Sequence, residues 1–389
     1  MSVRKVDVLI VGGGLVGTST AFFLRQRGLS VVVLERDRIG VHASGTNFGN
    51  VRRQGRYLPQ LPLANRSLSI WNRLPELLGE DVEFRATGHI RAILDEHSAT
   101  MAERFAADAL PYGLEIELLG HNAMRQRFPF FGERVIMGSF SPSDGQANPR
   151  LAAPAFARAA ERAGASIIEG ATAASIERVG DDFLLATPRH GTFRASAVQI
   201  SAGAWGGTLT ADLGEPVPMA PGAPQVAITE PLSTGIPSVV GVWTSDKTRN
   251  VYCRQVEQGN LVFGGGIRGK ASIEPSRATV DPKNTERQIA NLTDLIPTLA
   301  DARVIRSWSG VEGYIDDDLP VMGPSARQPG LFYAFGFCGY GFQLAPGVGD
   351  VMAELIATGR TETPIDEFTL DRFGSYSSGR DRAVQPASQ

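Results

Sequence analysis

A glycine cluster near the N-terminus is the clearest chemical pattern in the sequence. Residues 12–17 follow a Gly-x-Gly-x-x-Gly spacing in which Gly12, Gly14 and Gly17 hold the fixed positions. Small residues at such a turn let the backbone approach a pyrophosphate closely, and the N-terminus of the following helix stabilises its negative charge. The pattern therefore predicts a dinucleotide site at this turn.

An acidic residue follows at the separation that such a site requires. Glu35 stands at the end of a β-branched segment, and Arg36 beside it is a further candidate cofactor residue. A carboxylate roughly 20 residues beyond the glycines accepts hydrogen bonds from a ribose hydroxyl and repels a 2′-phosphate. A tight turn without a ligand is the alternative, and the glycine spacing alone does not distinguish NAD from FAD.

These residues need a strand, a helix and a second strand to position them. The apolar pattern predicts a strand over 6–11, a helix over 18–27 and a strand over 30–34, which together form a βαβ unit. A second Gly-x-Gly-x-x-Gly at 264–269 is a useful control. The segment after it contains Pro275 and no helical period, so we expect a strand end there and no phosphate site.

The rest of the chain alternates between helical and strand patterns. We expect helices over 61–80, 99–110, 149–163 and 282–296, strands over 84–94 and 166–169, a hairpin over 251–266, and a strand, glycine loop and helix over 331–356. The proline-rich stretch 214–241 predicts a crossing between domains. The polar tail after 373 is expected to be disordered.

Composition excludes several classes of protein. With 389 residues, 44 of them glycine, and a hydrophobic fraction of 42%, the chain is a large globular protein rather than a disordered or collagenous one. A net charge of −3 gives no footprint for nucleic acid or an anionic membrane, so a small-molecule partner is expected. Cys253 and Cys338 have no CxxC spacing, which argues against a disulfide framework and a zinc site.

The expected compartment is cytoplasmic. The apolar stretch near the N-terminus is interrupted by Asp7 and by the glycines, so it is typical of a strand and turn rather than a signal peptide. No run of about 18 apolar residues predicts a transmembrane segment. No metal site is expected, because His89 and His97 lack a third ligand and residues 316–318 are typical of an exposed acidic turn.

Three further segments resemble a known family. They are 42–50 (HASGTNFGN), 200–205 (ISAGAW) and 336–346 (GFCGYGFQLAP). Together with the glycine turn they resemble the D-amino acid oxidase/glycine oxidase (DAO) family of FAD-dependent oxidoreductases over almost the whole chain. Because of 51–54 (VRRQ), the sequence is most similar to the subgroup of hydrogen cyanide synthase, opine oxidase and D-amino acid dehydrogenase subunits.

The resemblance implies an α/β fold (α+β overall) in which a Rossmann-like FAD-binding domain is interleaved with an antiparallel-sheet substrate domain. The FAD-binding domain is expected to comprise 1–81, 143–220 and 309–389. The substrate domain is expected to comprise 82–142 and 221–308.

The resemblance also implies the cofactor residues. Gly12, Gly14 and Gly17 would bind the pyrophosphate of FAD, and Glu35 the adenosine ribose. The other implied FAD residues are Ser44, Thr46, Asn47, Gly49, Ala173, Gly203, Gly339, Gly341, Phe342, Gln343 and Leu344. A helix N-terminus at 339–344 would stabilise the negative charge of reduced flavin. Segment 312–316, where sarcosine oxidases place a flavin-linking cysteine, contains none, so noncovalent FAD is expected.

Three residues are candidate catalytic groups. Tyr252 matches a tyrosine that closes the substrate pocket in the family, and a core tyrosine is the alternative. Arg254 shares its strand face and is able to hold a carboxylate, although a solvated surface arginine is the default. Glu312 stands where many amino acid oxidases of this type carry a carboxylate-binding arginine.

An acid at position 312 favours a cationic amine or guanidinium group, and its alternative is a structural pair with an arginine. The presence of Glu312 instead of an arginine at this position argues against glycine or a neutral D-amino acid as the substrate. It favours a secondary amine or opine-like compound, with Arg52, Arg53 or Arg254 as the carboxylate anchor.

The expected reaction is therefore oxidation of a C–N bond in an amino acid or secondary amine. Hydride passes to flavin N5, and the resulting imine hydrolyses. The same fold fits the FAD-bearing subunit of a multi-subunit dehydrogenase with a non-oxygen acceptor and partner subunits. A noncatalytic flavoprotein, acting as a binding or assembly factor, is the alternative of another class.

Overall fold

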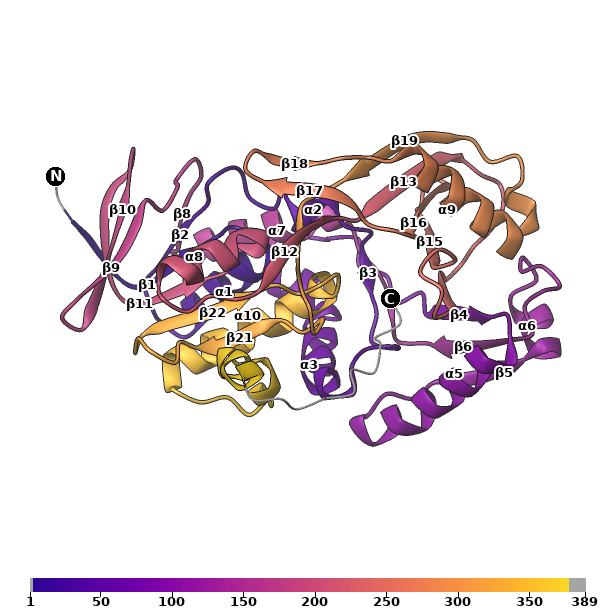
Figure 1. Ribbon diagram of the computed structural model, residues 1–389, viewed down its shortest axis with the longest axis horizontal. Coiled ribbons are helices and arrows are strands. Elements are labelled where there is room, and N and C mark those ends of the chain that lie inside the picture. Colours follow the sequence, from indigo (N-terminus) through magenta and orange to yellow (C-terminus); the bar gives the residue numbers. More distant parts are fainter. Residues whose placement is uncertain (1–2, 378–389) are drawn as a thin grey trace.

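The computed structural model describes residues 3–377, and its largest parallel sheet lies at the left of Figure 1. The strand order is β21-β22-β11-β1-β2-β8, and every neighbouring pair is parallel except β21–β22. The strands are β1 (Arg4–Val11), β2 (Val31–Leu34), β8 (Ser166–Ile168), β11 (Gly191–Ile200), β21 (Val321–Pro324) and β22 (Leu331–Phe335), with β9 (Ser175–Val179) and β10 (Asp182–Thr187) as an antiparallel extension.

The predicted βαβ unit is confirmed as β1, α1 (Leu15–Gln26) and β2. All four residues of β2 are buried, as expected for a central parallel strand covered on both faces. The helix begins three residues earlier than predicted, directly at the glycine turn. Gly17 makes this possible, because a Cβ there would lie 2.0 Å from the Gly12 carbonyl oxygen.

Helices cover the parallel sheet. They are α3 (Leu61–Trp71), α4 (Leu74–Leu78), α7 (Pro149–Arg162), α8 (Gly206–Asp212) and α10 (Gly341–Thr358). Helix α1 packs against both α7 and α10. The small, mostly buried alanines of α7 allow a close approach, and Phe156 packs edge-on against Phe22 at 5.8 Å. The N-terminal and C-terminal segments of the chain therefore share one core.

A second large sheet lies at the right of Figure 1, in the order β19-β13-β16-β15-β14-β4-β6-β5. It is antiparallel except for β14–β4. Its elements are β4 (His89–Ile93), β5 (Glu117–Gly120), β6 (Met137–Ser141), β13 (Gln225–Pro231), β14 (Val239–Trp243), β15 (Val251–Gln255), β16 (Asn260–Gly265) and β19 (Val304–Ser309), with helices α5 (Glu96–Ala109), α6 (His121–Arg127) and α9 (Pro282–Leu295). The predicted hairpin over 251–266 is confirmed as β15 and β16.

Two smaller sheets join the large ones. One has the order β18-β17-β12-β20, from β12 (Met219–Ala223), β17 (Gly269–Ile273), β18 (Ser276–Ala278) and β20 (Glu312–Ile315); the other pairs β3 (Asn50–Val51) with β7 (Gly145–Gln146). The short helix α2 (Ala43–Thr46) precedes β3. The control glycines at 264–269 span the end of β16 and the start of β17 with no helix, as predicted.

Two sequence expectations need correction. The predicted strand over 84–94 shortens to β4, because residues 84–88 follow the irregular path that turns at Gly88. The proline-rich stretch 214–241 is not only a crossing, since it contains β12, β13 and the start of β14.

At the C-terminal end, residues 370–377 form a 3-10 helix, and the rest of the predicted disordered tail lies outside the described residues. The mixed α/β architecture confirms the predicted fold class, while the domain boundaries stay a prediction. Among the helices within residues 3–377, none has both the length and the apolar character of a membrane span.

Candidate active site

A cavity of about 490 Å³ lies where the two large sheets meet. Residues directly after β1, β2, β11 and β22 line one side, which is the carboxyl edge of the parallel sheet. Residues of β4, β14 and β15 line another. Open α/β sheets bind ligands at this edge, so the topology places the site where the chemistry was expected.

The glycine turn forms the narrow part of the cavity. Gly12 and Gly14 line it, and Gly12 has φ +111°, where a Cβ would lie 2.5 Å from the Ser201 carbonyl oxygen. Only glycine fits this position. Gly17 does not line the cavity, so its part is to let α1 approach the turn rather than to touch a ligand.

Glu35 is held in place by backbone groups. Its carboxylate accepts hydrogen bonds from the N–H groups of Gly13 and Asp37, both at 2.7 Å, and only 7% of its surface is exposed. Arg36 also lines the cavity, with its guanidinium 4.3 Å from the centre of the Trp205 ring. Ala173 and Gly203 complete this end of the lining. A fixed carboxylate at the end of β2 fits a ribose hydroxyl.

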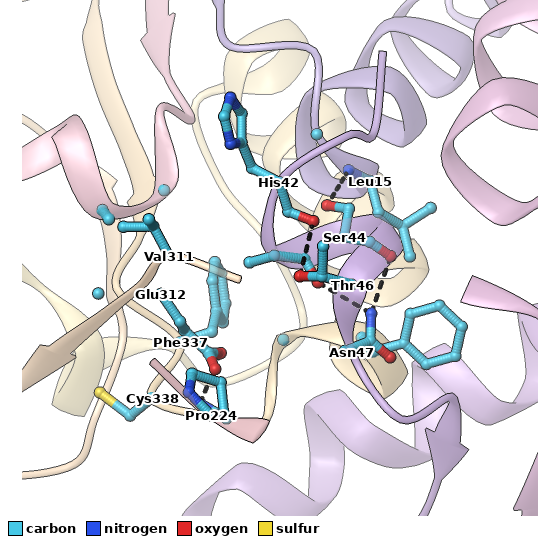
Figure 2. A pocket seen from close by; sticks show the side chains of 18 of the residues that line it. Leu15, His42, Ser44, Thr46, Asn47, Pro224, Val311, Glu312, Phe337 and Cys338 are labelled. Atoms are coloured by element: carbon cyan, nitrogen blue, oxygen red, sulfur yellow. Dashed lines mark hydrogen bonds between the residues drawn. The ribbon is translucent and has the colours of Figure 1, made fainter. Parts of the chain in front are cut away.

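The loop that contains α2 lines the next part of the cavity (Figure 2). Ser44 Oγ accepts a hydrogen bond from the Leu15 N–H at 2.9 Å, which ties the loop to the first turn of α1. The hydroxyl of Thr46 donates to the His42 carbonyl at 3.1 Å, and Asn47 Oδ1 accepts from the Gly49 N–H at 2.7 Å. Ser44, Thr46, Asn47 and Gly49 all line the cavity, and their contact with FAD stays a prediction.

Helix α10 begins at the same cavity. Gly339, Gly341 and Phe342 line it, whereas Gln343 and Leu344 do not, and the structure corrects the expectation for these two. The helical turn carries them away from the cavity. The Gln343 amide donates to the Ala64 carbonyl at 2.8 Å, and Leu344 is buried in the core of the parallel sheet.

These residues fit an FAD molecule. The N-termini of two helices, α1 and α10, lie at one cavity, and the Glu35 carboxylate would hold the adenosine ribose. The glycine turn would hold the pyrophosphate and the start of α10 the ring system. Within residues 3–377 no group of three or more His, Cys, Asp or Glu side chains is able to hold a metal ion.

Glu312 lies at the other end of the cavity, near Phe337 and Cys338 in Figure 2. Its carboxylate accepts hydrogen bonds from the Tyr314 hydroxyl at 2.8 Å and from the Gly339 N–H at 2.9 Å. Burial raises the pKa of Glu312 above its ordinary value. The Gly339 N–H was expected to serve the flavin edge, but in this structure it holds Glu312 instead.

Tyr252 lines the cavity on β15, and its role in closing a substrate pocket stays a prediction. Its ring packs against Phe48 with the ring centres 4.6 Å apart. Burial raises the pKa of its hydroxyl to about 12, so it remains a neutral donor. The side chain therefore combines an apolar wall with one polar tip.

Arg254 is a correction. It does not line the cavity and is not a surface residue, with only 8% exposed. Its guanidinium donates to the Phe48 carbonyl at 2.7 Å and to the Gln146 side chain at 3.2 Å, which fastens β15 to the β3–β7 pair. Arg53 is likewise structural, because it pairs with Asp144 at 3.1 Å. Of the three carboxylate anchors considered, only Arg52 lines the cavity.

The sequence analysis did not identify two cavity-lining residues on β4. His89 and Arg91 both line the cavity, and Tyr340 joins them from the loop before α10. The signal available in the sequence was a pair of basic residues two positions apart in a predicted strand, which places both on one face. Nothing local showed which face meets the cavity.

The two cysteines have inert surroundings. Cys338 lines the cavity, and its thiol donates to the Gly336 carbonyl at 3.1 Å; burial raises its pKa to about 12. Cys253 is fully buried in the second sheet. Noncovalent attachment of FAD stays a prediction.

The fold and cavity are typical of a dinucleotide-binding protein. The sequence matches the family described as FAD dependent oxidoreductase (DAO) over residues 7–355, so the chain belongs to that family. It is similar to one of the subunits of opine oxidase from Rhizobium meliloti, with 27% identity over 96% of this chain and 99% of that protein.

Glycine oxidase of Geobacillus kaustophilus (strain HTA426) is 28% identical over 95% of this chain and 97% of that protein. The crystal structure of L-proline dehydrogenase from P. horikoshii has a TM-score of 0.88 and 26% identity, covering 96% of this chain and 99% of the other. The protein is an FAD-dependent amine or amino acid oxidoreductase, which confirms the predicted cofactor and enzyme class.

Proposed function

We propose that the protein oxidises the C–N bond of an amino acid or secondary amine whose nitrogen lies beside Glu312. The observation that carries the proposal is a half-buried acid at the cavity wall, held by two donors and directly linked to the loop that opens α10. FAD, when bound, supplies the acceptor for two electrons.

The chain's own residues orient the donor and manage its charge. An amine gives up its α-hydrogen as hydride only when its nitrogen is neutral, so a group that accepts a proton nearby is useful. Glu312 suits this part because its raised pKa brings its protonation closer to neutral pH. The Tyr314 hydroxyl and Gly339 N–H fix its direction, and Tyr252 walls the pocket. The imine product hydrolyses to a carbonyl compound and an amine or ammonia.

A second candidate function is that of the FAD-bearing subunit of a larger dehydrogenase. It is supported by the similarity to the opine oxidase polypeptide, which is itself one subunit of its enzyme and of which this chain covers 99%. In that case electrons pass to another protein rather than to oxygen, and partner subunits are needed for turnover.

Anaerobic addition of amines and amino acids to the purified yellow protein tests both candidates. We expect at least one amine to bleach the flavin absorbance. Peroxide formed on re-aeration supports an oxidase, and bleaching without peroxide supports the multi-subunit dehydrogenase. No bleaching by any amine would leave the noncatalytic flavoprotein, and a colourless protein that does not take up FAD would contradict the whole account.

A further inference from the structure

Three arginines gather at one wall of the cavity and directly behind it. Arg52 and Arg91 line the cavity, and Arg56 lies directly behind Tyr340, with its guanidinium 5.1 Å from the centre of that ring. Arg56 and Arg91 are each only 4% exposed. We call Arg52, Arg56, Arg91 and His89 the basic wall.

Each buried guanidinium in the basic wall has one end tied and one end open. Arg91 donates twice to the Val242 carbonyl, at 2.9 and 3.3 Å, and lies 3.8 Å from the centre of the Trp243 ring. Arg56 donates to the Arg52 carbonyl at 2.8 Å. The Nη1 atoms of Arg56 and Arg91 are both buried and have no hydrogen-bond partner among the described residues.

The two guanidinium groups that line the cavity lie close together. A Cβ placed on Gly55 would lie 2.2 Å from Arg91 Nη1, which has no partner among the described residues, and 3.1 Å from Arg52 Nη1, which donates to the Gln54 carbonyl. The hydroxyl of Tyr340 is also buried without a partner in the part of the chain that the structure describes. Buried polar groups in native proteins have partners, so this group of donors points to a ligand that accepts hydrogen bonds.

Within residues 3–377, none of the ion pairs includes Arg52, Arg56 or Arg91. Asp144 lies close by, but it binds Arg53. Burial, and then the charge of Arg52, lowers the pKa of Arg56 and that of Arg91 to about 9. Buried positive charges without a counter-charge are costly, so the site requires an anion.

His89 adds a neutral donor. The Gln54 amide nitrogen lies 2.7 Å from His89 Nδ1 and donates to it, since Ser139 Oγ donates to the other end of that amide at 3.0 Å. Trp243 completes this series of hydrogen bonds, since its indole N–H donates to Ser139 Oγ at 2.7 Å. The proton of the imidazole therefore sits on Nε2, and burial lowers the pKa of His89 well below its ordinary value.

We infer that the basic wall is a subsite for a substrate that carries two carboxylates, an amino- or iminodicarboxylate, and this rests on the proposed oxidation of its C–N bond beside Glu312. Arg52 and Arg91 bring two positive charges to the cavity, and a single carboxylate would leave one of them unmatched. Two carboxylates would accept hydrogen bonds from these two guanidinium groups, the Tyr340 hydroxyl and His89 Nε2, all of which line the cavity. The class of substrate thus follows from the charge count of the wall.

Binding of acids that cannot be oxidised tests the inference without turnover. The FAD-loaded protein is titrated with succinate and glutarate, and with propionate and butyrate, while the visible flavin spectrum and the melting temperature are followed. We expect the dicarboxylates to bind about tenfold more tightly, or better, because of the second charged contact. Equal affinity for the two sets would overturn the inference.

Variants locate the binding. Arg91→Gln and Arg52→Gln are each expected to weaken dicarboxylate binding about tenfold or more and to reduce the preference for dicarboxylates, because both side chains line the cavity. Arg134→Gln is the matched control, because Arg134 is 59% exposed, pairs with Asp294 and does not line the cavity. Unchanged dicarboxylate affinity in the folded, FAD-loaded Arg91 and Arg52 variants would overturn the assignment.

The two proposals fail in different ways. Selective dicarboxylate binding with no amine able to bleach the flavin would refute the oxidation and leave the subsite intact. Bleaching by an amine together with equal binding of mono- and dicarboxylates would refute the subsite and leave the oxidation intact. If an Arg variant does not fold, the comparison of ligands on the unaltered protein still decides the matter.

Discussion

The two sides of the cavity are built by opposite means. On the FAD side, polar groups are satisfied by nearby backbone, as Glu35 is by Gly13 and Asp37. On the basic wall, buried donors of Arg56 and Arg91 are open. A side whose polar groups already have hydrogen-bond partners suits a permanently bound cofactor. A side with unpaired positive charge suits a ligand that binds and dissociates in each catalytic cycle. The predictions below test that difference, starting with the largest effect.

Gly12→Ala is expected to abolish FAD binding. The new methyl group would lie 2.5 Å from the Ser201 carbonyl at φ +111°. Strain and overpacking together should cost about 4 kcal/mol of unfolding free energy. FAD content from the visible spectrum and thermal unfolding measure both effects.

Gly28→Ala is the matched control for that prediction. Gly28 has φ +82° but open space around it, so only the backbone strain applies. We expect FAD to be retained and a loss of stability of about 1 kcal/mol. A Gly12 variant that keeps its FAD and melts like the Gly28 variant would show that the close approach at the turn is unimportant.

Asp144→Asn is expected to destabilise the segment that carries the basic wall and to weaken dicarboxylate binding. Asp144 is fully buried, pairs with Arg53 and accepts from the backbone N–H groups of Arg53 and Gln54. Loss of its charge leaves Arg53 unpaired and should cost about 3 kcal/mol, measured by denaturant unfolding. Dicarboxylate affinity should fall while FAD content stays unchanged. Loss of FAD with intact anion binding would contradict the separation of the two sides.

Glu35→Gln is expected to weaken FAD binding without affecting the anion. The carboxylate accepts two backbone hydrogen bonds and would accept one from the ribose. Replacing a charged acceptor should cost about 1.5 kcal/mol, or roughly tenfold in FAD affinity. Equilibrium dialysis measures the FAD affinity of the variant and of the unaltered protein. An unchanged affinity would place the ribose elsewhere.

Glu312→Gln is expected to have the smallest effect on stability, and its sign depends on pH. Burial raises the folded-state pKa of Glu312 above the ordinary 4.5, so the charged form disfavours folding. The unaltered protein therefore loses stability as pH rises from the ordinary value through the folded one. Glutamine does not titrate, so the variant should gain in melting temperature relative to the unaltered protein at higher pH only. A gain that is the same at pH 4 and pH 8 would contradict the raised pKa.

The FAD side was predictable because its signals are local. The glycine turn, α1 and Glu35 lie within one continuous segment, and their spacing reflects a single βαβ unit. Ser44, Thr46 and Asn47 follow directly in the chain. The resemblance extended the prediction to Gly339 and the start of α10, and the structure places these at the same cavity.

The basic wall was not predictable in this way. Arg52 and Arg56 follow β3, Arg91 lies on β4 and Tyr340 precedes α10, so only tertiary packing brings them together. Arg254 shows the opposite error. Strand alternation placed it beside Tyr252, but its long side chain reaches away from the cavity to the Phe48 carbonyl. The alternation of residues along a strand predicts which face of the sheet a side chain leaves from. It does not predict which groups the guanidinium at the end of a long side chain will contact.

Anaerobic stopped-flow reduction of the flavin tests the central claim most directly. The substrates are matched pairs that differ by one carboxylate, such as sarcosine and iminodiacetate, or alanine and aspartate in both enantiomers. The account predicts that in at least one pair the dicarboxylate reduces the flavin about tenfold more efficiently or better, and that Arg91→Gln removes the difference. Monocarboxylates that reduce the flavin as efficiently as their partners in every pair would contradict it.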